Sequence, residues 1–264
     1  MTLTPGLHED YDEAAYHADP ALSQSQAKTL LDCPARFRWE LSHPREDKPH
    51  FDIGHAVHAK VLGVGAPIVV VDADSWRTKA AKETADAARA EGRVPLLRAD
   101  AQTVDAMAEA VMAHPGARAI FEADGTSEVT LRWDDDDVPC RGRIDRLAET
   151  VDGMPTVIDL KTSASADPRD FGRSIAKFGY DLQDDWYSTG VEFLTGQRPA
   201  FVFVVIEKAA PHFASLGICD DEAKRIGREK RLRALDLYRE CSTSDLWPAF
   251  GDDIHIYPTP RWAS

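Results

Sequence analysis

The stretch Thr156–Ala164, TVIDLKTSA, places two charges at the end of an apolar strand. Its aliphatic residues are typical of a strand that is covered on one or both faces. Asp159 and Lys161 interrupt that run, and because alternate residues of a strand point to the same face, their side chains project together. The pattern indicates either a weak ion pair on a surface hairpin or a site that needs both charges. The preceding strands favour the second interpretation.

Two further predicted strands precede this one, and each carries an acidic residue. The sequences TSEVTLRW (126–133) and VPCRGRIDRLAET (138–150) have β-type patterns, and a run of aspartates between them supplies a turn. Glu128 lies at the start of the first strand, and Asp145 lies late in the second. Because neighbouring strands lie roughly 4.8 Å apart, Asp145 and Asp159 can converge on one point.

Such a pair of carboxylates predicts a bound cation. Two carboxylates that are brought together repel each other unless a cation lies between them. Oxygen ligands suit Mg²⁺ or Mn²⁺, which keep several waters and bind substrate phosphates. Lys161, beside Asp159, would then orient or activate a water, or stabilise charge on a phosphate oxygen.

Two more elements lie before and after these strands. In YDLQDDWYSTG, Gln183 and Tyr187 are four residues apart on a predicted helix and therefore share a face. In GHAVHAKVL, His58 borders the apolar face that Val61 and Leu62 form. Each pattern taken alone favours an ordinary structural role, an amphipathic helix edge in the first case and a core or half-buried histidine in the second.

The first half of the chain is predicted to be helical. Ser23 or Ser25 is expected to cap a helix. Residues 74–122 have apolar positions at helical spacing and are expected to form two helices, with a break near Gly92–Pro95. Nothing in that segment suggests chemistry, so it is interpreted as scaffold.

The second half alternates helices and strands. Helices are expected around residues 170–178 and 182–194, and PAFVFVVIEK (199–208) is expected to pair with HFASLGIC (212–219). A long charged helix over 220–241 is expected to bury a stripe of three residues, Leu232, Leu235 and Tyr238. No repeat or low-complexity linker divides the chain. We therefore expect one domain over residues 1–264, with a helical N-terminal part and insertion over about 1–122 and an α/β core over about 123–264.

Composition limits the class of protein. The chain has 264 residues, of which 43% are hydrophobic and 29% charged, which predicts a folded globular protein. Its net charge of −14 argues against a protein that coats nucleic acid without sequence preference. It does not exclude a nuclease with a local basic groove and an acidic centre that bound cations mask.

The chain shows no sign of a membrane segment or a cysteine-based site. No stretch approaches the ~18 apolar residues of a membrane-spanning helix, and the acidic N-terminus lacks the pattern of a signal peptide. The expected location is the cytoplasm, of a bacterium or of a phage-infected cell. The four cysteines lack metal-ligand spacing and are expected to be free thiols: Cys33, Cys140, Cys219 and Cys241.

Five short motifs occur in an order that resembles a known family. They are GHAVH, SEVTLRW, RGRID, VIDLKT and QDDWY. In this order they resemble the PD-(D/E)xK nucleases, and more narrowly the RecE-type exonuclease VIII group, which is related to the RecB nuclease domain and to lambda-type exonucleases. The N-terminal LSQSQAKTLLDCPARFRW is similar to the segment that precedes the histidine motif in RecB-like nucleases. The resemblance implies a restriction-endonuclease-like core, a central mixed β-sheet flanked by helices, with a helical insertion.

The resemblance also implies roles for individual residues. His58 and Glu128 would help to hold a metal. Asp145 and Asp159 would be the two metal-binding acids, and Lys161 the catalytic lysine. The remaining pair, Gln183 and Tyr187, corresponds to a motif that supports the site and contacts DNA. Many RecB-like relatives also bind an iron–sulfur cluster, but the cysteine spacing here departs from that pattern, so no cluster is expected.

The predicted activity is Mg²⁺- or Mn²⁺-dependent hydrolysis of DNA from double-stranded ends. Arg141 and Arg143 share strand parity with Asp145 and are expected to contact phosphates, whereas Arg146 should point to the opposite face. The resemblance further implies 5′-to-3′ polarity, a ring-like homo-oligomer, a single-strand annealing partner and a role in recombination, repair or phage DNA metabolism. The alternatives are a structure-specific or single-strand endonuclease on the same core, a catalytically idle DNA-binding module, and an unrelated α/β binding protein.

Overall fold

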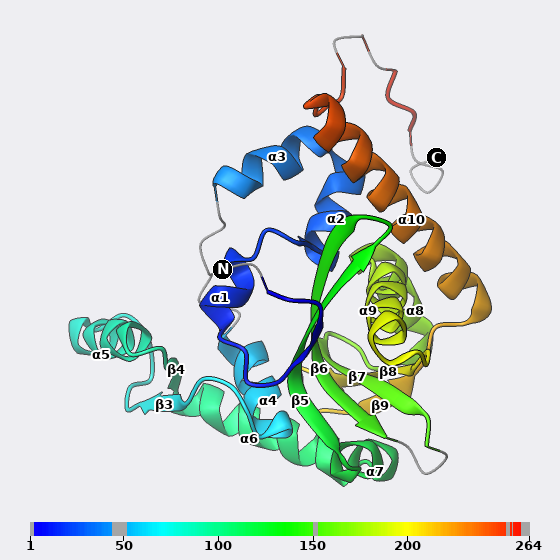
Figure 1. Cartoon of the computed structure of the whole chain (residues 1–264). Coiled ribbons are helices and arrows are strands. Elements are labelled where there is room, and N and C mark those ends of the chain that lie inside the picture. Colours follow the sequence, from blue (N-terminus) through cyan, green and yellow to red (C-terminus); the bar gives the residue numbers. More distant parts are fainter. Residues whose placement is uncertain (1–2, 44–51, 150–152, 252–253, 255, 260–264) are drawn as a thin grey trace.

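A computed structural model describes residues 3–43, 52–149, 153–251, 254 and 256–259. It is an α/β structure in which helices flank a central mixed sheet, as predicted (Figure 1). The strands are β1 (Gly6–His8), β2 (Leu22–Ser23), β3 (Ile68–Val71), β4 (Val94–Leu97), β5 (Gly125–Asp135), β6 (Val138–Glu149), β7 (Pro155–Ser163), β8 (Ala200–Glu207) and β9 (Ala214–Gly217). The helices are α1 (Glu13–Ala18), α2 (Gln24–Asp32), α3 (Pro34–Ser42), α4 (Asp52–Leu62), α5 (Lys79–Ala90), α6 (Arg98–Ala113), α7 (Pro115–Glu122), α8 (Pro168–Phe178), α9 (Tyr180–Thr195) and α10 (Asp221–Ser244).

The main sheet has the order β1-β5-β6-β7-β8-β9, with β2 added at β6. β7 and β8 are parallel, whereas the other pairs along that path are antiparallel. A two-residue loop at Asp136 and Asp137 joins β5 to β6, and both residues have positive φ, as the tight hairpin turn requires. The run of aspartates that predicted a turn therefore supplies one.

β6 changes partner along its length. Its C-terminal end pairs with β7 from Arg146 to Glu149, whereas nearer its start Cys140 and Arg141 pair with β2. β2 and β7 thus pair with different stretches of β6, and the pairing between β6 and β7 ends beside Asp145. We call this point, where β6 and β7 separate, the fork. This fork is where the predicted site residues meet.

The sheet is buried on both faces. Val157 of β7 belongs to the apolar cluster that contains Leu182 and Trp186 of α9. Ile158 and Leu160 belong to the cluster on the other face, with residues of α4, α6 and α7. The aliphatic run of β7 is therefore an interior strand, and the surface-hairpin interpretation of this stretch is wrong.

Two details of the predicted helices are wrong. Within the segment 74–122, residues 94–97 form strand β4, which pairs in parallel with β3. The segment also contains three helices, α5, α6 and α7, where two were expected. On α10, Leu232 is 43% exposed and lies outside the buried stripe, which instead includes Arg231, Ala234 and Leu235. Ser23, one of the two expected caps, forms a full capping box with Gln26 at the start of α2.

None of the described helices is long and apolar enough to cross a lipid bilayer. All four cysteines are buried and free.

A glycine allows α10 to lie against α9. A Cβ added at Gly227 would stand 2.1 Å from the backbone oxygen of Asp181. The two helices can only approach this closely because position 227 has no side chain.

We predict that Gly227→Ala destabilises the fold by roughly 3 kcal/mol, because the new methyl group collides with backbone that cannot rotate away. Urea unfolding followed by circular dichroism would measure the change. Gly172 on α8 is the matched control, since a Cβ there meets nothing within 4 Å. Gly172→Ala should stabilise by about 0.5–1 kcal/mol, the ordinary helical preference for alanine. Equal effects of the two changes would contradict the packing argument.

Candidate active site

Three acidic residues lie in one row across three neighbouring strands. The pairs Ser127–Arg146 and Val129–Ile144 flank the position where Glu128 of β5 faces Asp145 of β6. The pair Arg146–Ile158 is the last in the β6–β7 ladder, so Asp159 of β7 is the next residue opposite Asp145. The register therefore brings Asp145 and Asp159 together at the fork, as the sequence predicted.

Asp145 closes the fork with its side chain. Its Oδ2 accepts a hydrogen bond of 2.7 Å from the backbone N–H of Leu160, a group that the ended ladder leaves without a strand partner. The same oxygen lies 3.2 Å from Nε2 of His58. Burial acts to raise the pKa of Asp145, but His58, Lys161 and the Leu160 N–H together lower it below its ordinary value.

α4 presents His58 to Asp145. Nδ1 of His58 lies 2.9 Å from the carbonyl oxygen of Gly54 one turn earlier, which leaves Nε2 facing the carboxylate. Burial acts to lower the pKa of His58, but the Asp145 carboxylate outweighs this effect and raises the pKa to about 9. The imidazole is therefore positively charged at neutral pH in this arrangement.

Asp159 and Lys161 form a second ion pair beside the first. The Lys161 ammonium lies 2.5 Å from Oδ2 of Asp159 and 4.8 Å from the centre of the Tyr180 ring. Asp159 is 2% exposed, and burial raises its pKa, Lys161 lowers it and Asp145 raises it again, to about 6. The pKa of Lys161 is raised because Asp159 and Asp145 more than offset the effect of its burial.

α9 supplies the residues that face Asp159. Nε2 of Gln183 donates a hydrogen bond of 2.7 Å to Oδ1 of Asp159. The indole of Trp186 fixes the helix on β6 by donating to the carbonyl of Arg141 at 3.0 Å. The ring of Tyr187 lies over Gly142, where a Cβ would come within 2.9 Å of it. Gln183 and Tyr187 thus share the face of α9 that points to the site, as predicted.

Glu128 lies at the edge of this group in an unusual backbone conformation. It is the fourth residue of β5, rather than the first, and has a φ of 55°. A bulky residue that is not glycine seldom adopts this region. Burial and the nearby Asp145 raise its pKa. The carboxylates of Glu128 and Asp145 therefore lie close enough to repel each other.

The sequence did not identify Tyr16 of α1, which lies beside the site. Its ring centre is 4.6 Å from the guanidinium of Arg141 and 4.7 Å from that of Arg143. Burial raises the pKa of Tyr187 well above its ordinary value, and the nearby Tyr16, Asp159 and Asp145 raise it further. One aromatic residue in an acidic, non-periodic segment gives no signal of this placement.

Both arginines that were expected to contact phosphates form hydrogen bonds to the N-terminal segment. Arg141 is 4% exposed and donates to the carbonyl of Ala21, and half-buried Arg143 donates to the carbonyl of Tyr11. This burial makes the phosphate role wrong for Arg141. Arg146 points to the other side, where it donates to the carbonyl of Ala123.

The possible metal ligands at the site are of the chemical type that suits a hard divalent cation. Oδ2 of Asp159 is buried and accepts no hydrogen bond of good geometry, and a second carboxylate and an imidazole lie beside it. Carboxylate oxygens are suited to Mg²⁺ or Mn²⁺. Among the described residues, no three His, Cys, Asp or Glu side chains are arranged to hold a metal ion. In this arrangement His58 pairs with Asp145, and Lys161 pairs with Asp159.

Comparison with known proteins agrees with this architecture. The model of a family described as a PDDEXK-like domain of unknown function (DUF3799) matches residues 23–257. Among solved structures, a "Putative exonuclease" from Eubacterium rectale has a TM-score of 0.64 at 13% identity, over 96% of this chain and 97% of that one. A second, SSO0001, covers 80% of this chain and 85% of its own at 14% identity, with a TM-score of only 0.27. No curated protein matches the chain.

These matches confirm the predicted restriction-endonuclease-like core. The structural likeness, at so low an identity, speaks for the fold alone.

We predict a pH-dependent contribution of the His58–Asp145 pair to stability in the presence of EDTA. The folded pKa of about 9 lies above the ordinary value of 6.5, so the stabilisation is complete below pH 6.5 and is lost as the pH rises through 9. The difference in unfolding free energy between the wild type and His58→Gln should narrow over this window, by an amount of the order of 2 kcal/mol. Urea unfolding at several pH values measures it, and a constant difference would contradict the charged pair.

We also predict that the ring of Tyr16, more than its hydroxyl group, stabilises the N-terminal segment. Tyr16→Leu should lower the unfolding free energy by about 1–3 kcal/mol, because two guanidinium groups lose their aromatic partner. Tyr16→Phe keeps the ring and should cost clearly less. Thermal unfolding of both variants tests this. An equal loss in both would assign the effect to the hydroxyl group.

Proposed function

The chain belongs to the DUF3799 family of PDDEXK-like domains, and from this membership and the geometry of the fork we propose that it is a metal-dependent nuclease that hydrolyses DNA. The observation that carries the proposal is the convergence of Asp145, Asp159 and Lys161 at the open end of the β6–β7 ladder. Two carboxylates side by side, Asp159 buried and Asp145 half-buried, favour a bound cation, and burial together with the charge of Asp145 raises the pKa of Asp159.

In this proposal Asp145 and Asp159 hold Mg²⁺ or Mn²⁺, with His58 and Glu128 as further ligands. The ion supplies positive charge to the scissile phosphate and lowers the pKa of a bound water. The backbone N–H of Leu160 and the side chain of Gln183 each fix one carboxylate, so the pair is oriented before substrate arrives.

Lys161 acts on the water and on the phosphate. The Tyr180 ring and Asp159 restrain its ammonium, and the side chain is 18% exposed and can reach a ligand in the fork. From that position it orients the attacking water and stabilises negative charge on a phosphate oxygen. Tyr187, packed over Gly142, supports the helix and offers a contact to the DNA backbone.

We further propose that the enzyme is an exonuclease of the RecE type that acts on double-stranded ends. The name of the Eubacterium rectale relative supports the exonuclease mode. A role in recombination, repair or phage DNA metabolism, a single-strand annealing partner, a homo-oligomer, a single domain and a cytoplasmic location belong to the same proposal. So does the expectation that no iron–sulfur cluster is bound.

We predict that the protein with Mg²⁺ or Mn²⁺ degrades linear duplex DNA and leaves covalently closed circles intact. EDTA should abolish the activity. Asp159→Asn and Lys161→Met should each lower the rate by about 10²–10⁴-fold, because each removes charge that the transition state needs. Gln183→Ala should cost less, since it only orients Asp159. Gel electrophoresis of end-labelled and circular substrates measures all of these rates.

Asp170→Asn is the matched control, because Asp170 is an exposed carboxylate on α8 that pairs only with neighbours on the surface. It should retain full activity. If closed circles were cut as fast as linear DNA, the activity would be that of an endonuclease and the exonuclease proposal would fail. No hydrolysis with any divalent metal would leave a DNA-binding module without catalysis and would refute the proposal.

A further inference from the structure

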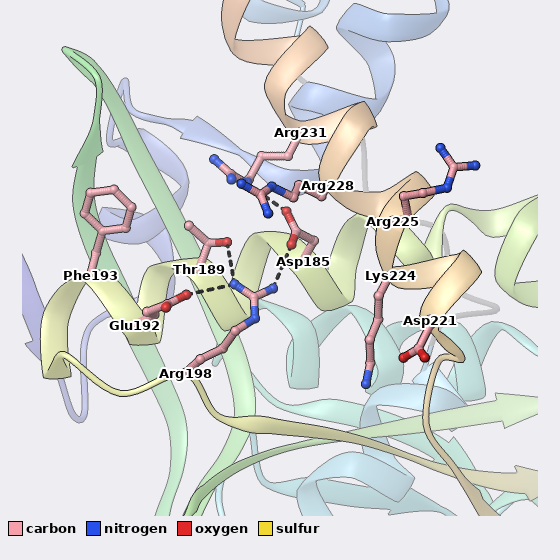
Figure 2. Close-up of a pocket in the computed structure, with 10 residues that line it drawn as sticks. All are labelled: Asp185, Thr189, Glu192, Phe193, Arg198, Asp221, Lys224, Arg225, Arg228 and Arg231. Atoms are coloured by element: carbon pink, nitrogen blue, oxygen red, sulfur yellow. Dashed lines mark hydrogen bonds and ion pairs between the residues drawn. The ribbon is translucent and has the colours of Figure 1, made fainter.

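A cavity lined by several charged side chains lies between α9 and α10, away from the fork. It has a volume of about 610 Å³ and is lined by side chains from both helices (Figure 2). On α9 its walls are Asp185, Thr189, Glu192 and Phe193. Gln183 points from the same helix to the fork, and residues 185, 189 and 192 lie roughly 180–240° around the helix from it at 100° per residue. The cavity is thus on the opposite side of α9 from the candidate active site.

The cavity is positively charged, in contrast to the rest of the molecule. Five cations line it, namely Arg198, Lys224, Arg225, Arg228 and Arg231, against three acids. The chain as a whole carries a net charge of −14. A local excess of positive charge on an acidic protein attracts anions to that place.

Two of these arginines form a fixed frame. Arg198 donates to Asp185, Glu192 and Thr189, as the dashed lines in Figure 2 show. Arg231 is 7% exposed and donates to the other oxygen of Asp185. Their charges are therefore largely balanced within the protein, and they shape the floor of the cavity.

Two other cations remain available to a ligand. Lys224 and Arg228 are exposed and lie one turn apart on α10, and their side chains form no hydrogen bond or ion pair with another residue in the described part of the chain. The Lys224 charge does act on buried Asp184. Arg225 is different, because Glu222 and Glu229 already hold its guanidinium. The cavity therefore has two unpaired cations, Lys224 and Arg228, and both lie on the wall that α10 forms.

The opposite wall carries an exposed aromatic ring. Phe193 of α9 is 56% exposed, and the figure shows it at the far end of the cavity from Lys224 (Figure 2). An aromatic ring that stands free at the mouth of a cavity offers a surface on which a planar group can stack.

We propose that this cavity binds a nucleotide, with the phosphate between Lys224 and Arg228 and the base against Phe193. A volume of about 610 Å³ is in the range of small-molecule sites. A doubly charged phosphate matches the two unpaired cations, which lie one turn apart on α10, better than a single carboxylate does. The nucleotide is either free or part of a nucleic-acid strand, and the experiment separates these sources. The site does not depend on nuclease activity.

The test is isothermal titration of the full chain in EDTA, where hydrolysis of DNA is not expected. The probes are deoxyadenosine monophosphate, inorganic phosphate, deoxyadenosine, and a short single-stranded oligonucleotide without terminal phosphates. We expect the monophosphate to bind with a dissociation constant of roughly 0.1–1 mM, and more tightly than phosphate or nucleoside alone. A strand that binds more tightly than the monophosphate, and through the same residues, identifies nucleic acid as the source.

Variants place the binding in the cavity. Lys224→Gln, Arg228→Gln and Phe193→Ala should each weaken binding of the monophosphate, by about tenfold for a lost charge-assisted contact. Arg233→Gln is the matched control, because Arg233 is exposed on the same helix but does not line the cavity. It should bind as the wild type does. Asp159→Asn should also bind normally, so that loss of nuclease activity and loss of this site can be told apart.

Two results would overturn the proposal. The first is no binding of either the monophosphate or the strand. The second is binding that the three cavity variants leave unchanged, which would place the nucleotide elsewhere, the fork included. The four positions substituted on α9 and α10, Phe193, Lys224, Arg228 and Arg233, are exposed, and circular dichroism of every variant, Asp159→Asn included, would verify that it is folded.

Discussion

The carboxylate of Asp145 is the contact on which the candidate site depends. It takes up the backbone N–H of Leu160 where the β6–β7 ladder ends, and the same oxygen pairs with His58 of α4. This one side chain therefore holds α4 and the end of the β6–β7 ladder together, next to Asp159. The low dielectric of the interior makes such charges costly unless each has a partner. The structure meets this requirement with His58 beside Asp145 and Lys161 beside Asp159.

The fork also explains how the N-terminal segment is held. Once β6 has left β7, its first half needs other partners, and the short strand β2 supplies backbone pairing at Cys140 and Arg141. Arg141 and Arg143 then bind carbonyl groups of the same segment and enclose Tyr16. Burying polar groups in this way is favourable only because they find hydrogen-bond partners. The part of the sheet that opens the site therefore also anchors the beginning of the chain.

The sequence predicted the features that depend on local residue patterns. It did not predict those that depend on contacts between distant segments of the chain. Alternation along β7 and the order of the acids predicted the row that Asp145 and Asp159 form, and spacing predicted the common face of Gln183 and Tyr187. β2 is two residues long and β4 is four, too short for any periodicity, so only their long-range pairing reveals them. Arg141 was misassigned because strand parity gives a direction but not the segment that covers it. Leu232 was misassigned because α10 turns Gly227 and Arg231 toward α9, and this orientation buries Leu235 but leaves Leu232 exposed.

The N-terminal segment has a consequence for how the boundaries of this domain are drawn. The family match begins at residue 23, in the middle of the two-residue strand β2 and at the residue that caps α2. A boundary at that point would discard β1, which extends the sheet beside β5, together with Tyr16 and the carbonyl groups that the two arginines bind. Two guanidinium groups would then lie next to the fork with no aromatic ring between them. β1 and the segment that carries Tyr16 are therefore bound to the sheet that carries the site, although they precede the residues that the family model matches.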